Sequence, residues 1–523
     1  MDDKISSVVC YAGREMLKEF EHVQHVVVLM LENRSFDHLC GFLYSGQRRP
    51  KHFLPSHSTI EFNGMPPSFS NPSNPAYFSG RGASDEVTVR IGAENRCIPH
   101  ENPQERFEHV NLQLFGTSQP APGQQPSMNG FIVSYAEKNP GRGHEIMQCY
   151  TPDQLPTFSA LAYNFAISDE WYASVPTQTW PNRAFFHIGT SMGQVDDYPC
   201  DPFAYDTPTI FNVLTAQKIS WAVFNDSSLT SSTRLQFPQL WDALLEPHFQ
   251  NLEAFEKDAR AGNLPAYSFL EPSFLVDPND AHPPHDMLLA DRLIWRVWQA
   301  VSTGAHWEST LLLITYDEHG GCVDHQPPSY GCPAPDEHRG PNGFAFDRYG
   351  VRVPMIAVSP WIEAGTVFRS PTDRPYDHTS VLATLRDWLE IPNNAMLKSR
   401  RIESAPNLGH LLTRSEPRTD IPAIPYPAGK ATKHRLDLAP NDFQKGLMLS
   451  FAHRMGIRGG LKLLEHVPTG STSPTSSKLS ASATTARTSD RRIACGGAAV
   501  SEEMRSRPTT GPQCFASTPP PLR

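Results

Sequence analysis

The sequence predicts an α/β fold in which a mostly parallel central sheet is covered by helices on both faces. Its most apolar runs are short, do not alternate with polar residues, and are rich in leucine or β-branched residues. Such runs are typical of strands buried on both faces, and they are Val26 to Leu31, Trp221 to Phe224, Leu311 to Thr315 and Val353 to Trp361. Helical patterns lie between them, and this alternation favours one large α/β domain.

Two helices can be placed along the chain from local patterns. Ser35 can cap a first turn whose apolar side chains fall on one face, namely Phe36, Leu39, Cys40 and Leu43. From Asp286 to Val301, apolar residues recur at helical spacing directly ahead of the run Leu311 to Thr315. Each helix therefore adjoins one of the predicted buried strands.

The composition is that of an ordinary globular protein and excludes some classes of function. The chain has 523 residues and a net charge of −10, so it lacks the basic surface that nucleic-acid binding needs. No run reaches the ~18 apolar residues of a transmembrane helix, and the first residues lack the apolar core of a signal peptide. The nine cysteines are scattered singly, which favours free thiols in a reducing compartment. We therefore expect a cytoplasmic or membrane-peripheral protein, with export left open if the true start lies upstream.

Two stretches depart from the α/β pattern. Between about residues 48 and 125 the periodicity fails, and we expect an insertion that forms a rim or lid over the site. From residue 467 onward, serine and threonine dominate and apolar residues are few, which predicts disorder. The expected division is an N-terminal extension (1–20), a domain (21–466) with that insertion, and a disordered tail (467–523).

Acidic and amide side chains follow two of the predicted strands. Glu32 and Asn33 come directly after the first strand, while Asp317, Glu318 and His319 come after the third, ahead of two glycines. Ligands of open α/β sheets bind beyond the carboxyl ends of the strands, so these side chains should converge. Three carboxylates and a carboxamide without Lys or Arg would repel one another unless a divalent cation joined them. Any one of these acids, taken alone, is equally well interpreted as a helix cap or an ion-pair partner.

Hydroxyl and imidazole groups supply further candidates for chemistry. In the segment Ser174 to Arg183, a hydroxyl ahead of a proline-stiffened turn is placed to act as a nucleophile, although a plain Thr/Pro loop also explains the pattern. Histidines flanked by Pro and Asp are candidates for proton transfer or phosphate contacts, and they are His100, His282, His285 and His378.

The string HVVVLMLENRSFDHLCGFL resembles the opening signature of the bacterial and plant phosphoesterase family. That family contains the non-haemolytic, phosphatidylcholine-preferring phospholipases C, the plant non-specific phospholipases C and a group of acid phosphatases. The resemblance spans about residues 22 to 390. It recurs in order in MNGFIVSY (128–135), LPTFSALAYNFAISDEWYASVPTQTWPNR (155–183), DPNDAHPPHD (277–286), LITYDEHGGCVDH (313–325), GVRVPMIAVSPWI (350–362) and DHTSVLATL (377–385).

The resemblance implies a fold similar to the alkaline phosphatase and sulfatase superfamily, and it implies roles for individual residues. The implied ligands of one divalent ion of unspecified identity are Glu32, Asn33, Thr179, Asp317 and Glu318, and Thr179 is also the implied nucleophile. The implied catalytic histidines are His282, His378 and His100. The last lies in the family's Asp-x-x-His segment, where Cys97 stands in place of the aspartate. Asn182, Arg183 and His319 are expected to contact the substrate.

We therefore expect a metal-dependent phosphoesterase. Phospholipase C activity on glycerophospholipids through a covalent phosphothreonine fits best, with diacylglycerol and a phosphorylated headgroup as products and with peripheral membrane contact. One alternative is an acid phosphatase acting on small phosphomonoesters. Another is a catalytically silent protein that binds phospholipid or a partner, which would be expected to lack a metal-binding acid or the nucleophile. The sequence leaves open the headgroup preference, the choice between diesters and monoesters, and the oligomeric state.

Overall fold

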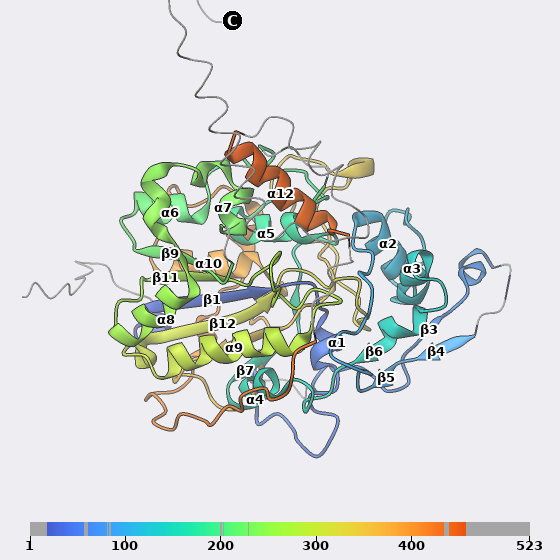
Figure 1. The fold of residues 1–523 in the computed structure, drawn as a ribbon, viewed down its shortest axis with the longest axis horizontal. Helices are drawn as coiled ribbons and strands as arrows, with labels where there is room; N and C mark the ends of the chain where they lie inside the picture. Colours follow the sequence, from blue (N-terminus) through green and yellow to red (C-terminus); the bar gives the residue numbers. More distant parts are fainter. Residues whose placement is uncertain are drawn as a thin grey trace, which may run out of the picture. The chain divides into compact units, whose positions relative to one another are not determined.

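A nine-stranded sheet runs through the molecule (Figure 1). In spatial order its strands are β10 (Phe249–Asn251), β9 (Trp221–Asn225), β11 (Tyr267–Glu271), β1 (His25–Leu31), β12 (Thr310–Tyr316), β13 (Met355–Val358), β7 (Ala166–Ser168), β14 (Thr366–Phe368) and β2 (His52–Leu54). Neighbouring strands are parallel except at β13, which runs antiparallel to both β12 and β7. The predicted mostly parallel α/β sheet is confirmed.

The computed structural model describes residues 18–456, with gaps at 57–60, 81, 83–84, 199–200, 202, 228–229 and 433–438. The predicted tail (467–523) and nearly all of the predicted N-terminal extension (1–20) lie outside the described residues. The described residues belong to one compact unit, Met1–Ser473. None of the helices described in it is long and apolar enough to cross a bilayer.

All four of the predicted buried runs form strands, and they are β1, β9, β12 and β13. The strands β1 and β12 pair in parallel along their whole length, with Leu31 opposite Tyr316 at their carboxyl ends. The fourth run is shorter than predicted and runs antiparallel. Pro354 and Pro360 lie on either side of β13, and because proline has no N–H to donate, the ladder cannot extend through them.

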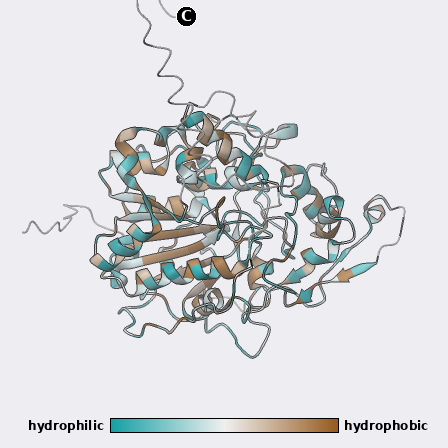
Figure 2. Ribbon diagram, viewed as in Figure 1, coloured by the Kyte–Doolittle hydropathy of each residue, from teal (hydrophilic) through white to brown (hydrophobic). Residues whose placement is uncertain are grey.

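Helices cover both faces of this sheet. The described α-helices are α1 (Phe36–Cys40), α2 (Phe107–Phe115), α3 (Phe131–Lys138), α4 (Pro156–Asn164), α5 (Thr179–Ile188), α6 (Ile210–Ala216), α7 (Ser232–Gln236), α8 (Leu252–Ala261), α9 (Met287–Ser302), α10 (Thr379–Trp388), α11 (Arg400–Ser404) and α12 (Asp442–Arg454). Figure 1 shows α4, α8 and α9 on one face and α5, α6 and α10 on the other. In Figure 2 the central strands are strongly hydrophobic, as burial between two helical layers requires.

The two predicted helices are both present with the expected caps. The Ser35 side chain accepts from the backbone N–H of His38 and begins α1. The Asp286 side chain accepts from the backbone N–H of Leu288 and begins α9, which packs against both β1 and β12.

The predicted insertion is only partly outside the sheet. Its early segment β2 is the edge strand of the central sheet, so the prediction of a continuous excursion from about residue 48 is wrong there. Beyond β2, the chain forms α2, α3 and the short strands β3 (Ser70–Pro72), β4 (Glu86–Thr88), β5 (Arg90–Ile91) and β6 (Gln148–Cys149). A separate hydrophobic cluster holds this region together. It includes Val110, Leu114 and Phe131, and it reaches Cys322 and Val323 in the loop after β12. The remaining short pair is β8 (Trp171–Tyr172) with β15 (Tyr376–Asp377).

Candidate active site

Acidic side chains from two paired strands meet at one edge of the sheet. Glu32 directly follows β1, and Asp317 and Glu318 directly follow β12. The backbone N–H of Asn33 donates to Asp317 Oδ1 over 3.2 Å, which fastens the two strand ends to each other. All four side chains are buried, with at most 1% of each exposed.

The turn after β12 fits closely against Asn33. Asn33 has φ +56°, a left-handed conformation that asparagine tolerates better than most residues. Gly320 has φ +62°, and a Cβ at this position would lie 2.1 Å from the backbone oxygen of Asn33. The Gly320 N–H also donates to Glu318 Oε2 over 2.7 Å. A glycine is therefore required here for the two strand ends to approach each other.

Thr179 is the first residue of α5, and its hydroxyl faces the Asn33 side chain. Thr179 Oγ1 lies 3.4 Å from Asn33 Nδ2 and 3.5 Å from Asn33 Oδ1. Its side chain is fully buried. The Thr177 hydroxyl instead donates to the Val195 carbonyl over 2.5 Å, so it points away from the acidic cluster. Of the two threonines, Thr179 is the one placed for chemistry.

Asn182, which was expected to contact substrate, holds the loop before α5. Its Nδ2 donates to the carbonyls of Val175, Thr177 and Gln178, and its Oδ1 accepts from the Val175 N–H. These bonds to the backbone let Asn182 fix the loop that carries Thr179. The structure thus shows a positioning contact for Asn182.

Arg183 lies among the acids rather than in front of them. Its Nε donates to Asp317 Oδ2 over 3.0 Å, and its Nη2 lies 3.6 Å from Glu32 Oε1. The expectation that the acids gather without a Lys or Arg is therefore wrong. The guanidinium is buried and stacks 5.2 Å from the ring of Phe274, so it anchors the two carboxylates instead of facing solvent.

Glu105 is a member of the cluster that the sequence interpretation missed. It comes from the insertion, it is buried, and its Oε2 accepts from Asn33 Nδ2 over 2.9 Å. No spacing signal marked it, because Glu105 lies in an irregular stretch and follows no predicted strand or helix. The interpretation placed the family's Asp-x-x-His segment at Cys97 to His100 instead.

His282 also reaches this cluster. Its Nε2 lies 3.7 Å from Glu105 Oε1 and 3.1 Å from the Asn441 amide, while its Nδ1 lies 2.6 Å from the Pro283 carbonyl. Burial lowers the pKa of His282, but the hydrogen bond and negative charge of Glu105 outweigh burial and raise it above the usual value. The imidazole is therefore held in a form that can donate a proton.

His378 and His319 are held neutral beside the cluster. His378 Nε2 lies 2.5 Å from the backbone oxygen of Asp317, and Trp171 Nε1 donates to His378 Nδ1 over 3.4 Å. Burial lowers the pKa of His378 to about 4 and that of His319 to about 3. Both ring nitrogens of His378 have partners, and the contact with the Asp317 carbonyl places this histidine directly beside the acidic cluster. His319 Nε2 lies 2.7 Å from Gln113 Oε1, which ties it to the insertion.

His100 is not brought to the cluster. Its Nδ1 lies 3.2 Å from Glu145 Oε1, and its Nε2 lies 2.9 Å from the Asn95 amide. Both partners belong to the insertion and its connection to β6. His100 therefore lies within the insertion, and the residue of this region that contacts Asn33 is Glu105.

The chemistry of the donors fits a divalent cation. Glu318 Oε1 and Thr179 Oγ1 both approach the Asn33 amide nitrogen, so these groups face a common point. Exchanging the amide oxygen and nitrogen of Asn33 would present an all-oxygen donor set of the kind that hard cations take. Burial, reinforced by neighbouring acids, raises the pKa of Glu32 and Glu318 well above the usual value. Ionising all of these carboxyl groups together therefore needs more positive charge than Arg183 supplies through its contacts with Glu32 and Asp317.

A second acidic group lies behind the first. The ligand atoms of Asp37, Asp324 and His325 all lie within 4.8 Å of one another, a spacing that could hold a metal ion. The buried Arg352 guanidinium already bridges them, with Nη2 3.1 Å from Asp37 Oδ1 and 3.0 Å from Asp324 Oδ1. Because Asp37 follows Asn33 and Asp324 follows Glu318 along the chain, this ionic clamp fastens the two loops that carry the site.

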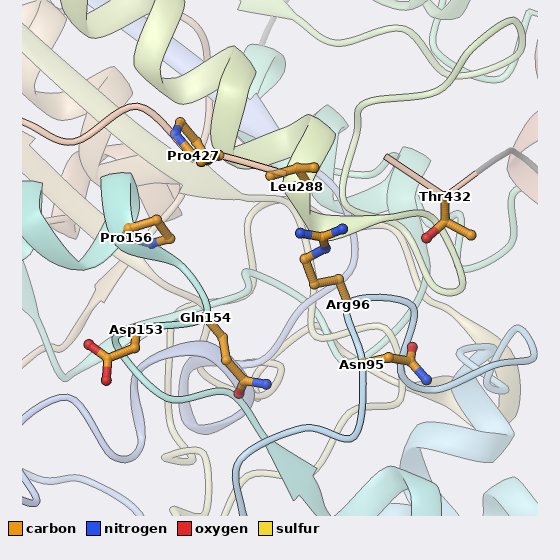
Figure 3. A pocket seen from close by; sticks show the side chains of 9 residues that line it. Asn95, Arg96, Asp153, Gln154, Pro156, Leu288, Pro427 and Thr432 are labelled. Atoms are coloured by element: carbon orange, nitrogen blue, oxygen red, sulfur yellow. The ribbon is translucent and has the colours of Figure 1, made fainter. Parts of the chain in front are cut away.

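The cavity shown in Figure 3 is separate from the acidic cluster. Its volume is about 380 Å³, and none of its nine lining residues belongs to the cluster. Arg96, which projects into it, is paired with Asp286 over 3.2 Å. The reactive groups are instead packed against one another in the interior.

Comparisons with known proteins complete this description. The sequence profile of the phosphoesterase family matches residues 23–392. Non-specific phospholipase C6 of Arabidopsis thaliana is 36% identical over 440 residues, which cover 81% of this chain and 79% of that protein. Phospholipase C A of Mycobacterium tuberculosis is 27% identical over 420 residues, which cover 71% and 73% respectively. Among solved structures, a protein in the alkaline phosphatase superfamily from Vibrio parahaemolyticus is 11% identical, with a TM-score of 0.28. The match covers 44% of this chain and 59% of that protein's chain.

Proposed function

This chain belongs to the phosphoesterase family, and on that premise we propose that it is a phospholipase C. It hydrolyses glycerophospholipids to diacylglycerol and a phosphorylated headgroup, as a phosphoric diester hydrolase. The observation that carries the proposal is the Thr179 hydroxyl, held 3.4 Å from the Asn33 amide inside the acidic cluster. Because the substrate belongs to a bilayer, the enzyme contacts the membrane peripherally.

We propose that one divalent ion would be held by Glu32, Asn33, Thr179, Asp317 and Glu318. When bound, such an ion neutralises phosphate charge and lowers the pKa of a nearby hydroxyl. Arg183 holds the carboxylates of Glu32 and Asp317 in place through its paired contacts. His378 holds the backbone of Asp317 from the other side.

The chain's own groups carry out the transfer in two steps. Thr179 Oγ1 passes its proton to a carboxylate of the acidic cluster and attacks phosphorus, and as the Oγ–P bond forms, the bond from phosphorus to the glycerol oxygen breaks. His282 gives its proton to that departing oxygen, so diacylglycerol leaves as an alcohol. Water then gives a proton to His282 and attacks the phosphothreonine. As the Oγ–P bond breaks, the carboxylate returns its proton to Thr179 Oγ1 and the phosphorylated headgroup leaves. The position of Thr179 at the start of α5 adds the partial positive charge of a helix N-terminus beside the phosphate.

The test uses defined phosphatidylcholine vesicles and identifies the products. Diacylglycerol and phosphocholine support the proposal, whereas free choline or free fatty acid contradicts it. Comparing p-nitrophenylphosphorylcholine with p-nitrophenyl phosphate separates a phospholipase C from an acid phosphatase. Absence of turnover on both substrates, with intact folding and bound metal, identifies a catalytically silent binding protein.

A further inference from the structure

We propose that Glu105, supplied by the insertion, is a further oxygen ligand of the divalent ion, beside Glu318. This inference rests on the proposed metal-dependent function and adds to it a ligand that comes from neither strand end. Glu105 lies in the loop that leads into α2, far in sequence from both β1 and β12.

The contacts of Asn33 place Glu105 at the same point as the other donors. Asn33 Nδ2 donates to Glu105 Oε2 over 2.9 Å, and the same nitrogen contacts Glu318 Oε1 and Thr179 Oγ1. Three oxygens from three separate segments therefore surround one nitrogen. A cation at that point would meet all three, with the Asn33 amide turned to present its oxygen.

Among the described residues, the two glutamates are approached by imidazoles but not by a lysine or arginine, with His282 Nε2 3.7 Å from Glu105 Oε1 and His319 Nδ1 3.2 Å from Glu318 Oε2. Arg183 pairs with Glu32 and Asp317, and no lysine or arginine of the described part of the chain forms an ion pair with Glu105 or Glu318. Both glutamate side chains accept from the same Asn33 nitrogen, so their carboxylates lie side by side, and a divalent ion at that point can balance the two charges.

The backbone around Glu105 is fixed, as a ligand requires. Gln113 Nε2 donates to the Gln104 carbonyl over 2.7 Å, and a Cβ on Gly321 would lie 2.8 Å from that same carbonyl. The loop is thus pressed directly against the turn that follows Glu318. Movement of Glu105 away from the site would disturb both contacts.

Titration calorimetry with Mn²⁺ on the metal-stripped protein tests the inference. Glu105→Gln keeps the shape of the side chain and removes its charge, and we expect the Kd for Mn²⁺ to rise about 10- to 100-fold. Glu108→Gln, an exposed change three residues away, should leave the Kd unchanged. The rise in melting temperature on adding Mn²⁺ should shrink in Glu105→Gln and persist in Glu108→Gln.

Other outcomes are equally decisive. If Glu105→Gln folds and binds Mn²⁺ within about twofold of the wild type, Glu105 is not a ligand and serves only His282. If the wild type itself binds none of Mn²⁺, Mg²⁺, Ca²⁺ or Zn²⁺, the metal-dependent function fails, and this inference fails with it. If Glu105→Gln does not fold, Glu105→Asp is used, and an unchanged Kd in that shortened variant overturns the assignment.

Discussion

Alanine substitutions at Thr179 and Thr177 should have opposite effects on activity and stability. Thr179 Oγ1 makes only contacts of 3.4 and 3.5 Å, so removing it should change the free energy of unfolding by about 1 kcal/mol or less. The Thr177 hydroxyl donates a 2.5 Å bond to the buried Val195 carbonyl. Thr177→Ala leaves that acceptor unpaired and should cost about 1 to 3 kcal/mol.

The activities should rank the other way. Thr179→Ala removes the proposed nucleophile and should lower kcat roughly 10⁴-fold or more, while Thr179→Ser should retain substantial activity because serine supplies the same oxygen. Thr177→Ala should keep most of the activity of the folded enzyme. Urea denaturation measures the stabilities, and release of p-nitrophenol from p-nitrophenylphosphorylcholine measures kcat. An inactive Thr177→Ala beside an active Thr179→Ala would refute the assignment, and activity in both would exclude a covalent intermediate.

Three further predictions concern stability. Burial, and next the charge of Arg183, hold the pKa of His187 well below 6.5. Below pH 6.5 the unfolded chain therefore binds a proton that the folded chain does not, and the free energy of unfolding decreases as the pH is lowered, by up to about 1.4 kcal/mol per pH unit. His187→Gln should narrow the difference in melting temperature between pH 7 and pH 5, and an unchanged difference would contradict this. Arg352→Met should lower the free energy of unfolding by about 3 to 5 kcal/mol, because it leaves two buried carboxylates uncompensated; an unchanged urea midpoint would show that the clamp contributes nothing. Removing residues 467–523 should preserve the thermal transition and hydrolysis, because serine and threonine dominate this segment and its apolar residues are few. Loss of the transition would show that the tail is part of the fold.

The sequence predicted the centre of the sheet well because that part of the fold depends on local signals. The runs that became β1 and β12 are apolar throughout and end in acids, so burial, strand and site are encoded together. Three-residue strands such as β7 and β14 carry no comparable signal, because they are defined by their neighbours in the sheet. The reversed direction of β13 likewise depends on the path of the chain, which an apolar run does not encode.

Residues at strand ends were predictable from spacing, and Thr179 and His282 from the family resemblance, but the other members of the site were not. Asp317 and Glu32 follow strands directly, whereas Glu105 enters from an irregular loop whose path is set by long-range packing against Gly321. Arg183 was expected to face a substrate, but its distance to Asp317 is a property of the folded chain. Charge compensation inside a buried cluster is in general invisible to sequence spacing.

Helix α12 contacts the site from a part of the chain that lies outside the family match. The family match ends at residue 392, yet Asn441 at the start of α12 contacts His282, and Phe443 lies 6.0 Å from the guanidinium of Arg183. The groups of the site and the side chains of α12 that contact them are thus encoded in separate stretches of the chain. Mutations in α12 can therefore change the surroundings of His282 and Arg183 while the stretch that matches the family stays unchanged.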